Sequence, residues 1–94
     1  MPSTVPIRIT IVEMSGCPHC DAARAVIAAE IAARPDLRVE VTRLDAAAPE
    51  GARLVAEHRA PQAPLVLVDG EFLSSGRLRA AALRRRLPAA SVAC

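Results

Sequence analysis

Apolar and polar side chains alternate along two short stretches of the chain, a pattern typical of β-strands that bury one face. The first covers residues 7–12, IRITIV, which are rich in β-branched side chains. The second covers residues 37–44, LRVEVTRL. A third apolar run, residues 65–68, is followed by Asp69-Gly70 and by a short apolar run at residues 71–73. An Asp-Gly pair between two such runs predicts a β-hairpin.

Between these stretches, the apolar side chains recur at the spacing of a helix. Residues 18–34 begin with Pro18, which suits the first helical position, and Pro35 closes the segment. Residues 49–59 predict a shorter helix, which Gly51 weakens because glycine is a poor helix former.

The last helix is predicted over residues 77–87, RLRAAALRRRL, with Pro88 as its stop. We expect Ser74 or Ser75 to cap its first turn, since serine is a favoured N-cap residue.

The resulting order is β-α-β-α-β-β-α, which predicts the α/β class. A helix between the first two strands implies that they pair in parallel through a right-handed crossover. The closing hairpin adds antiparallel strands, so we expect a four-stranded mixed sheet with helices on both faces. The chain of 94 residues is expected to form one domain, residues 1–94, with its core at about 7–87 and a loose tail at 88–94.

Composition and charge narrow the classes of function. Hydrophobic residues make up 52% of the chain, the one aromatic residue is Phe72, and the net charge is +2. This balance predicts no nucleic-acid binding, because there is neither a strong basic field nor an aromatic stacking platform. No apolar run approaches the roughly 20 residues that a membrane span needs, and the first 16 residues do not have the pattern of a signal peptide. We therefore expect a cytoplasmic monomer that does not bind membranes.

The segment SGCPHC carries the candidate chemistry, because it places Cys17 and Cys20 at a junction between a strand and a helix. The unpaired amides and the positive dipole end of a helix favour a thiolate, and such positions lower a cysteine pKa from about 8.5 to roughly 3.5–7.5. We expect Cys17 to be the attacking nucleophile. Cys20 lies one turn further along, closer to the core, where it is expected to resolve the mixed disulfide.

Other readings of the pair remain open. His19 is either a group that tunes the redox balance of the pair or an exposed variable position. A metal or iron–sulfur carrier using the same cysteines is the alternative function. A closed zinc site usually needs four ligands, however, and nothing places His58 or Cys94 near the pair. We therefore expect no resident metal, and we interpret Cys94 as an incidental free thiol.

Cys-Pro-His-Cys after a first strand, together with Pro64 before the third strand, resembles the thioredoxin superfamily, and in detail its compact glutaredoxin-like branch. The resemblance covers about residues 7–87. It implies a thioredoxin-like fold and a dithiol–disulfide oxidoreductase without a bound cofactor. It also implies that Pro64 is cis beside the redox pair, which the sequence alone does not decide. The backbone of Ala63 would then dock an extended substrate.

Within that branch, three segments are similar to the glutaredoxin-like redoxins that donate electrons to ribonucleotide reductase. They are LDAAAPEGARL, QAPLVLVDG and LSSGRLRAAALRRRL. This similarity implies that Gln62, Ser75 and Gly76 take part in substrate binding.

The chain departs from glutaredoxins that use glutathione. It has Met14 where they carry a basic residue, Gln62-Ala63 where they have Thr-Val, and no acidic pair after Gly76. Each missing contact to a charged group costs on the order of 1.5–3 kcal/mol. We therefore expect a disulfide-containing protein as substrate and a thioredoxin-reductase-type flavoprotein as the electron source, with glutathione as the alternative.

Overall fold

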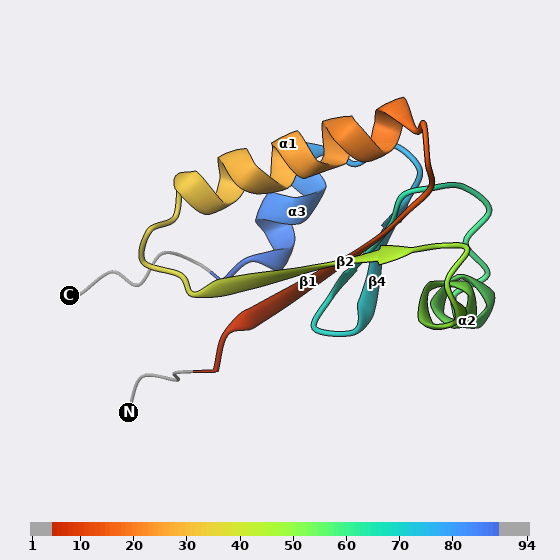
Figure 1. Cartoon of the computed structure of the whole chain (residues 1–94). Coiled ribbons are helices and arrows are strands. Elements are labelled where there is room, and N and C mark those ends of the chain that lie inside the picture. The colour runs from red at the N-terminus through yellow and green to blue at the C-terminus, as the bar shows by residue number, and fades with distance from the viewer. Residues whose placement is uncertain (1–4, 89–94) are drawn as a thin grey trace.

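A computed structural model describes residues 5–88 of the chain (Figure 1). In chain order, its elements are β1 (Ile7–Glu13), α1 (Pro18–Ala32), β2 (Val39–Asp45), α2 (Pro49–Glu57), β3 (Leu65–Val68), β4 (Glu71–Ser75) and α3 (Ala80–Arg86). The predicted order β-α-β-α-β-β-α is confirmed.

The four strands form one mixed sheet in the order β2-β1-β3-β4. β2 pairs with β1 in parallel, whereas β3 is antiparallel to both β1 and β4. The four apolar residues of β3 are all buried, as expected of a strand covered on both faces. Asp69 and Gly70 both have positive φ, at 51° and 81°. These values are those of the tight hairpin turn that an Asp-Gly pair predicts.

Helices cover both faces of this sheet, as predicted. α1 and α3 pack together on one face, and α2 lies on the other (Figure 1). Because side chains alternate along a strand, β1, β2 and β3 each supply side chains to both cores. The core under α1 and α3 contains Ile9, Ile11, Ala23, Ile27, Val66, Val68, Leu78, Leu83 and Leu87. The core under α2 contains Val12, Leu65 and Leu67, with Leu44, Leu54 and Val55 packed against them.

The start of the last helix was predicted wrongly. Ser74 and Ser75 belong to β4, and α3 begins only at Ala80, after an N-cap residue, Arg79, that makes no side-chain cap bond. The chain first turns at Gly76, where φ is 90°, and then buries Leu78 in the core. The serine hydroxyls are used elsewhere, so they do not cap the helix.

The helix predicted over residues 18–34 ends two residues early, at Ala32. The backbone N–H of Arg34 bonds to the carbonyl of Ile31 at 3.0 Å, and its guanidinium pairs with Asp36. Because of this turn, the next strand begins at Val39 and not at residue 37. Pro35 accounts for the break, because the residue before a proline disfavours helical backbone.

The last turn of α3 consists of three consecutive arginines, Arg84, Arg85 and Arg86, and some of them contact neighbouring elements. Arg84 pairs with Glu30 on α1 at 3.0 Å, and Arg86 pairs with Glu71 on β4 at 2.7 Å. Two of the three arginines therefore tie α3 to its neighbours. No helix within residues 5–88 is long and apolar enough to cross a membrane. The predicted loose tail, including Cys94, lies outside the described residues apart from Pro88.

Candidate active site

The segment between β1 and α1 places Cys17 at the start of the helix. Gly16 has a φ of 65°, a conformation that glycine adopts without a steric cost, and Pro18 is the first residue of the helix. Cys17 is the N-cap residue, with extended backbone, and its Sγ accepts a hydrogen bond from the backbone N–H of Cys20 at 3.1 Å. The predicted placement of Cys17 is confirmed.

Cys20 lies one turn further along the helix, with only 1% of its surface exposed, whereas Cys17 is half-buried. Burial raises the pKa of the Cys20 thiol from 9.0 to about 11, and a hydrogen bond with Cys17 contributes in the same direction. Both cysteines are free thiols. The pair therefore consists of an accessible sulfur with an N–H donor and a buried sulfur that keeps its proton.

The raised pKa of Cys20 predicts a loss of stability in alkali. In the folded protein the thiol holds its proton up to about pH 11, whereas the unfolded chain releases it near 9.0. The unfolded chain therefore binds fewer protons in this window, so the free energy of unfolding falls as the pH rises from 9 through 11. Urea unfolding of the reduced protein between pH 8 and pH 10.5 measures this fall.

The control for this prediction is Cys20→Ala, in which the fall should be smaller. Few other groups titrate in this window, because every basic side chain other than histidine is arginine and the chain has no tyrosine. The thiols of Cys17 and Cys94 are present in both proteins, so their contribution is shared. Equal pH dependence in the two proteins would contradict the assignment.

A loop far away in sequence meets Cys17. The peptide bond between Ala63 and Pro64 is cis, as the resemblance implied, and Pro64 is fully buried. The thiol of Cys17 donates a long hydrogen bond, 3.9 Å, to the carbonyl oxygen of Ala63. The fold thus brings the predicted nucleophile and the predicted docking residue into contact. That Ala63 docks substrate stays a prediction.

Hydrogen bonds hold this loop in place, and they involve Gln62, Ser75 and Gly76. The hydroxyl of Ser75 donates to the carbonyl of Gln62 at 2.8 Å and accepts from the N–H of Gln62 at 3.2 Å. The N–H of Gly76 donates to the carbonyl of Pro64 at 3.0 Å. A Cβ at Gly76 would clash with the side-chain amide of Gln62. These residues hold the loop in place, and their predicted contact with substrate remains untested.

The histidines lie apart from each other. His19 is exposed beside the pair, and its side chain makes no hydrogen bond or ion pair within residues 5–88, so its tuning role stays a prediction. His58, at the end of α2, stacks on Phe72 with ring centroids 6.4 Å apart. In the part of the chain that the structure describes, no three His, Cys, Asp or Glu side chains gather in a group that could hold a metal ion.

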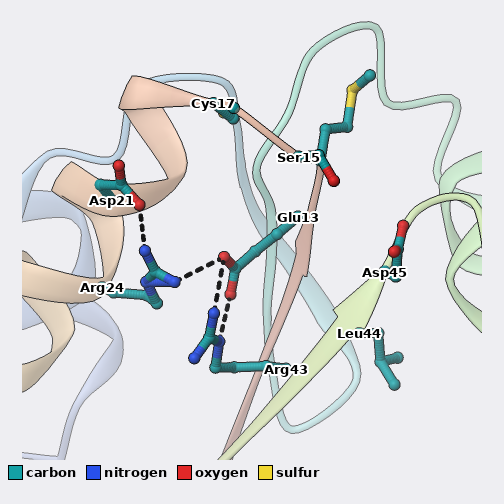
Figure 2. Close-up of a pocket in the computed structure, with 10 residues that line it drawn as sticks. Glu13, Ser15, Cys17, Asp21, Arg24, Arg43, Leu44 and Asp45 are labelled. Carbon is teal, nitrogen blue, oxygen red and sulfur yellow. Dashed lines mark hydrogen bonds and ion pairs between the residues drawn. The ribbon is translucent and has the colours of Figure 1, made fainter.

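A polar hollow lies beside Cys17, and sequence reasoning missed it. This polar hollow has a volume of about 470 Å³ and is lined by Glu13, Met14, Ser15, Gly16, Cys17, Asp21, Arg24, Arg43, Leu44 and Asp45. Figure 2 shows Glu13 at its centre, between two arginines from different elements. Arg24 of α1 donates to Glu13 at 3.0 Å, and Arg43 of β2 donates to it at 2.7 Å.

Glu13 is the group that organises this hollow. Its side chain is only 13% exposed, and hydrogen bonding to it raises the pKa of Arg43. The sequence did contain a signal, because Glu13 follows Ile9 and Ile11 at the period of a strand and so falls on their face of the sheet. A carboxylate continuing an apolar stripe predicts a charged partner on a neighbouring element.

A second, apolar hollow of about 210 Å³ lies on the other side of the site. It is lined by Val12, Met14, Ala46, Val55, Ala60, Pro61, Gln62, Ala63 and Leu65, and no charged side chain is among them. Met14, which is 58% exposed, lines both hollows. Cys17 therefore lies in a surface whose two sides differ sharply in polarity.

The sequence matches no protein-family model, and no curated protein matches it in sequence. The fold does have solved counterparts. Mitochondrial thioredoxin 3 from Saccharomyces cerevisiae, in its oxidized form, superimposes with a TM-score of 0.60 at 18% identity, covering 88% of this chain and 77% of the other.

A protein of unknown function from Staphylococcus aureus, SA0789, gives a TM-score of 0.64 at 11% identity, covering 88% of this chain and 89% of the other. A malarial protein gives 0.61 at 10% identity, covering 89% of this chain and 100% of the other. At such identities the likeness concerns the fold alone. The chain has a thioredoxin-like fold in its compact form, with four strands and three helices in residues 5–88.

Proposed function

We propose that this protein is a dithiol–disulfide oxidoreductase that reduces protein disulfides through Cys17 and Cys20. The observation that carries the proposal is the position of Cys17. Its sulfur caps a helix of 15 residues, accepts the N–H of Cys20, and faces the carbonyl of Ala63 in a cis-proline loop. A half-buried sulfur with an amide donor, next to a buried thiol, is the arrangement that thiol–disulfide exchange requires.

The reaction proceeds in two exchanges. In the first, the thiolate of Cys17 attacks one sulfur of the substrate disulfide, whose S–S bond breaks. The product is a mixed disulfide, and the substrate's other sulfur leaves as a thiolate that takes up a proton. In the second, Cys20 gives up its proton and attacks the sulfur of Cys17. The substrate leaves as a dithiol carrying two more electrons, and the protein retains a Cys17–Cys20 disulfide.

The buried position of Cys20 suits the second step. A thiol whose pKa is raised to about 11 is protonated at neutral pH and does not compete with Cys17 for the substrate. Cys20 lies three residues from Cys17 on the same helix, and its backbone N–H already bonds to the sulfur that it would attack. The order of attack thus follows from burial.

We further propose that electrons reach the oxidised protein from a thioredoxin-reductase-type flavoprotein in the cytoplasm, with no cofactor bound to the chain itself. The apolar hollow supports this choice. It contains Ala63, the proposed docking group, and on that side of Cys17 no lining side chain is charged to pair with the two carboxylates and the ammonium group of glutathione. Met14 stands at its edge, where a cation would be needed.

A coupled assay tests both the reaction and the reductant. NADPH oxidation is followed with a disulfide-bonded model protein as substrate, once with thioredoxin reductase and once with glutathione and glutathione reductase. We expect turnover in the first system at a rate at least about tenfold above the second, because each unpaired charge on glutathione carries a cost of this order. Turnover only with glutathione would overturn the proposed reductant, and turnover with neither would overturn the oxidoreductase.

A further inference from the structure

The polar hollow is not needed for exchange between Cys17 and Cys20, yet Cys17 forms part of its lining. A substrate disulfide that reaches the sulfur of Cys17 therefore comes to lie at the edge of this hollow. Ala63, the proposed docking group, lines the apolar hollow on the other side and does not line this one. Consecutive Cα atoms of a substrate are 3.8 Å apart, so residues one or two positions from its cysteine come within reach.

The charges of the hollow decide which side chain it accepts. Three carboxylates and two guanidinium groups line it, which leaves one negative charge before Cys17 itself ionises. Both arginines are already occupied. Arg24 bonds to Glu13 and to Asp21, and Arg43 bonds to both carboxylate oxygens of Glu13 (Figure 2). An anionic side chain that approaches either arginine would lie close to the carboxylate of Glu13, which already pairs with both and is the most enclosed group of the cluster.

The carboxylates at the rim are more available than the arginines. Asp45 accepts the backbone N–H of Ala47 at 2.8 Å through one oxygen and has no ion pair within residues 5–88. The side chain of Asp21 is 73% exposed and shares Arg24 with Glu13. Figure 2 shows these two carboxylates on opposite sides of the hollow, with Glu13 between them. A cation entering from solvent therefore meets the exposed carboxylate of Asp21 and that of Asp45, which is not neutralised by an ion pair within residues 5–88.

We propose that the polar hollow is a specificity site that receives a basic side chain, Lys or Arg, next to the disulfide-bonded cysteine of the protein substrate. This inference rests on the proposed function and names the substrate class of the same site. Asp21 and Asp45 make the contact with the cation. Glu13 acts as a positioning residue, since it fixes Arg24 and Arg43 and so prevents them from repelling the incoming charge.

Single-turnover reduction of short peptides tests the inference without any reductase. Each peptide carries one cysteine in a disulfide with 2-mercaptoethanol, and the residue on either side of that cysteine is in turn Lys, Gln or Glu. The pre-reduced protein, with Cys94→Ser, is mixed with each peptide, and the second-order rate constant for peptide thiol release is measured. We expect Lys to exceed Gln by about two- to fivefold and Gln to exceed Glu by a similar factor, as for exposed ion pairs.

Two variants and added salt test whether the preference for the Lys peptide arises in the polar hollow. In the double variant Asp21→Asn and Asp45→Asn, the ratio of the rate constant for the Lys peptide to that for the Gln peptide should fall to near unity. Asn can keep the bond that Asp45 accepts from Ala47, so the local turn is preserved. Glu50→Gln, an exposed acid on α2 outside the hollow, is the matched control and should keep the preference. About 0.5 M salt should weaken the preference in the wild type.

The outcomes separate the two proposals. Equal rate constants for the three peptides would overturn the specificity site and leave the oxidoreductase intact. Faster reduction of the Glu peptide would also overturn it, because Arg24 and Arg43 would then be the groups that bind substrate. A preference for Lys that survives in the double variant would move the contact elsewhere on the surface and contradict the assignment to this hollow. Failure to reduce any peptide would refute the proposed function and the specificity site together.

Discussion

Replacing Cys17 with serine is expected to abolish disulfide reduction, lowering kcat/KM by at least about 100-fold. The sulfur at this position accepts the N–H of Cys20 and faces the carbonyl of Ala63, and in the proposed mechanism it is the group that attacks the substrate. A hydroxyl stays protonated at neutral pH and cannot leave or attack in thiol–disulfide exchange. The measurement is the coupled reduction of a disulfide-bonded model protein by the wild type and by Cys17→Ser.

Two controls make this result specific. Serine at position 17 can still cap α1, because its oxygen also accepts the N–H of Cys20. The thermal midpoint of Cys17→Ser should therefore stay within a few degrees of the reduced wild type. Cys94→Ser should keep full activity, since Cys94 has no part in the proposed reaction. Turnover near the wild-type rate in Cys17→Ser would contradict the mechanism.

Replacing Gly51 with alanine is expected to destabilise the protein by about 1–3 kcal/mol, although alanine is the better helix former. Gly51 lies in the first turn of α2 and is buried against the end of β2. A Cβ built there would overlap the carbonyl oxygen of Asp45 and lie 2.7 Å from its carbonyl carbon. Both groups are backbone, so relief requires α2 to move away from the sheet. Urea unfolding of the reduced proteins measures the difference.

The same helix supplies a matched control at an exposed position. Ala56→Gly makes the reverse change where nothing packs against the side chain, and it should cost about 0.5–1 kcal/mol through helix propensity alone. If propensity also governed position 51, Gly51→Ala would be stabilising by a similar amount. A stabilised Gly51→Ala would therefore refute the close approach of α2 to Asp45.

The elements that could be predicted from the sequence are those whose signals are local. The alternation in β1, the proline at the start of α1 and the Asp-Gly turn each act over a few residues, and all three are confirmed. The start of α3 could not be predicted in this way. Ser75 has the residue type of a helix cap, but its hydroxyl bonds to Gln62, which lies 13 residues earlier in sequence. A tertiary contact outweighed the local preference.

The residues of the candidate site likewise fall into two groups, those with a local signal in the sequence and those that come together only in the folded chain. Cys17 and Cys20 stand out because their spacing and their place before a helix are visible in the sequence. The cis state of the Ala63-Pro64 bond followed only from resemblance, because most X-Pro bonds in folded proteins are trans. The polar hollow was missed, since Glu13, Arg24 and Arg43 come from three separate elements and meet only in the folded sheet. Its opposite charges largely offset one another, so the net charge of the chain gave no hint of them.

The central claim is that Cys17 is the sulfur that attacks the substrate, with Cys20 as the buried thiol that resolves the intermediate. Its most direct test is to mix Cys20→Ser, in a Cys94→Ser background, with a disulfide-bonded substrate and to map the trapped species by mass spectrometry after digestion. The account predicts a stable mixed disulfide between the substrate and Cys17, and no such adduct on Cys20 when Cys17→Ser is treated in the same way. An adduct on Cys20 in that second protein, or none on Cys17 in the first, would contradict it.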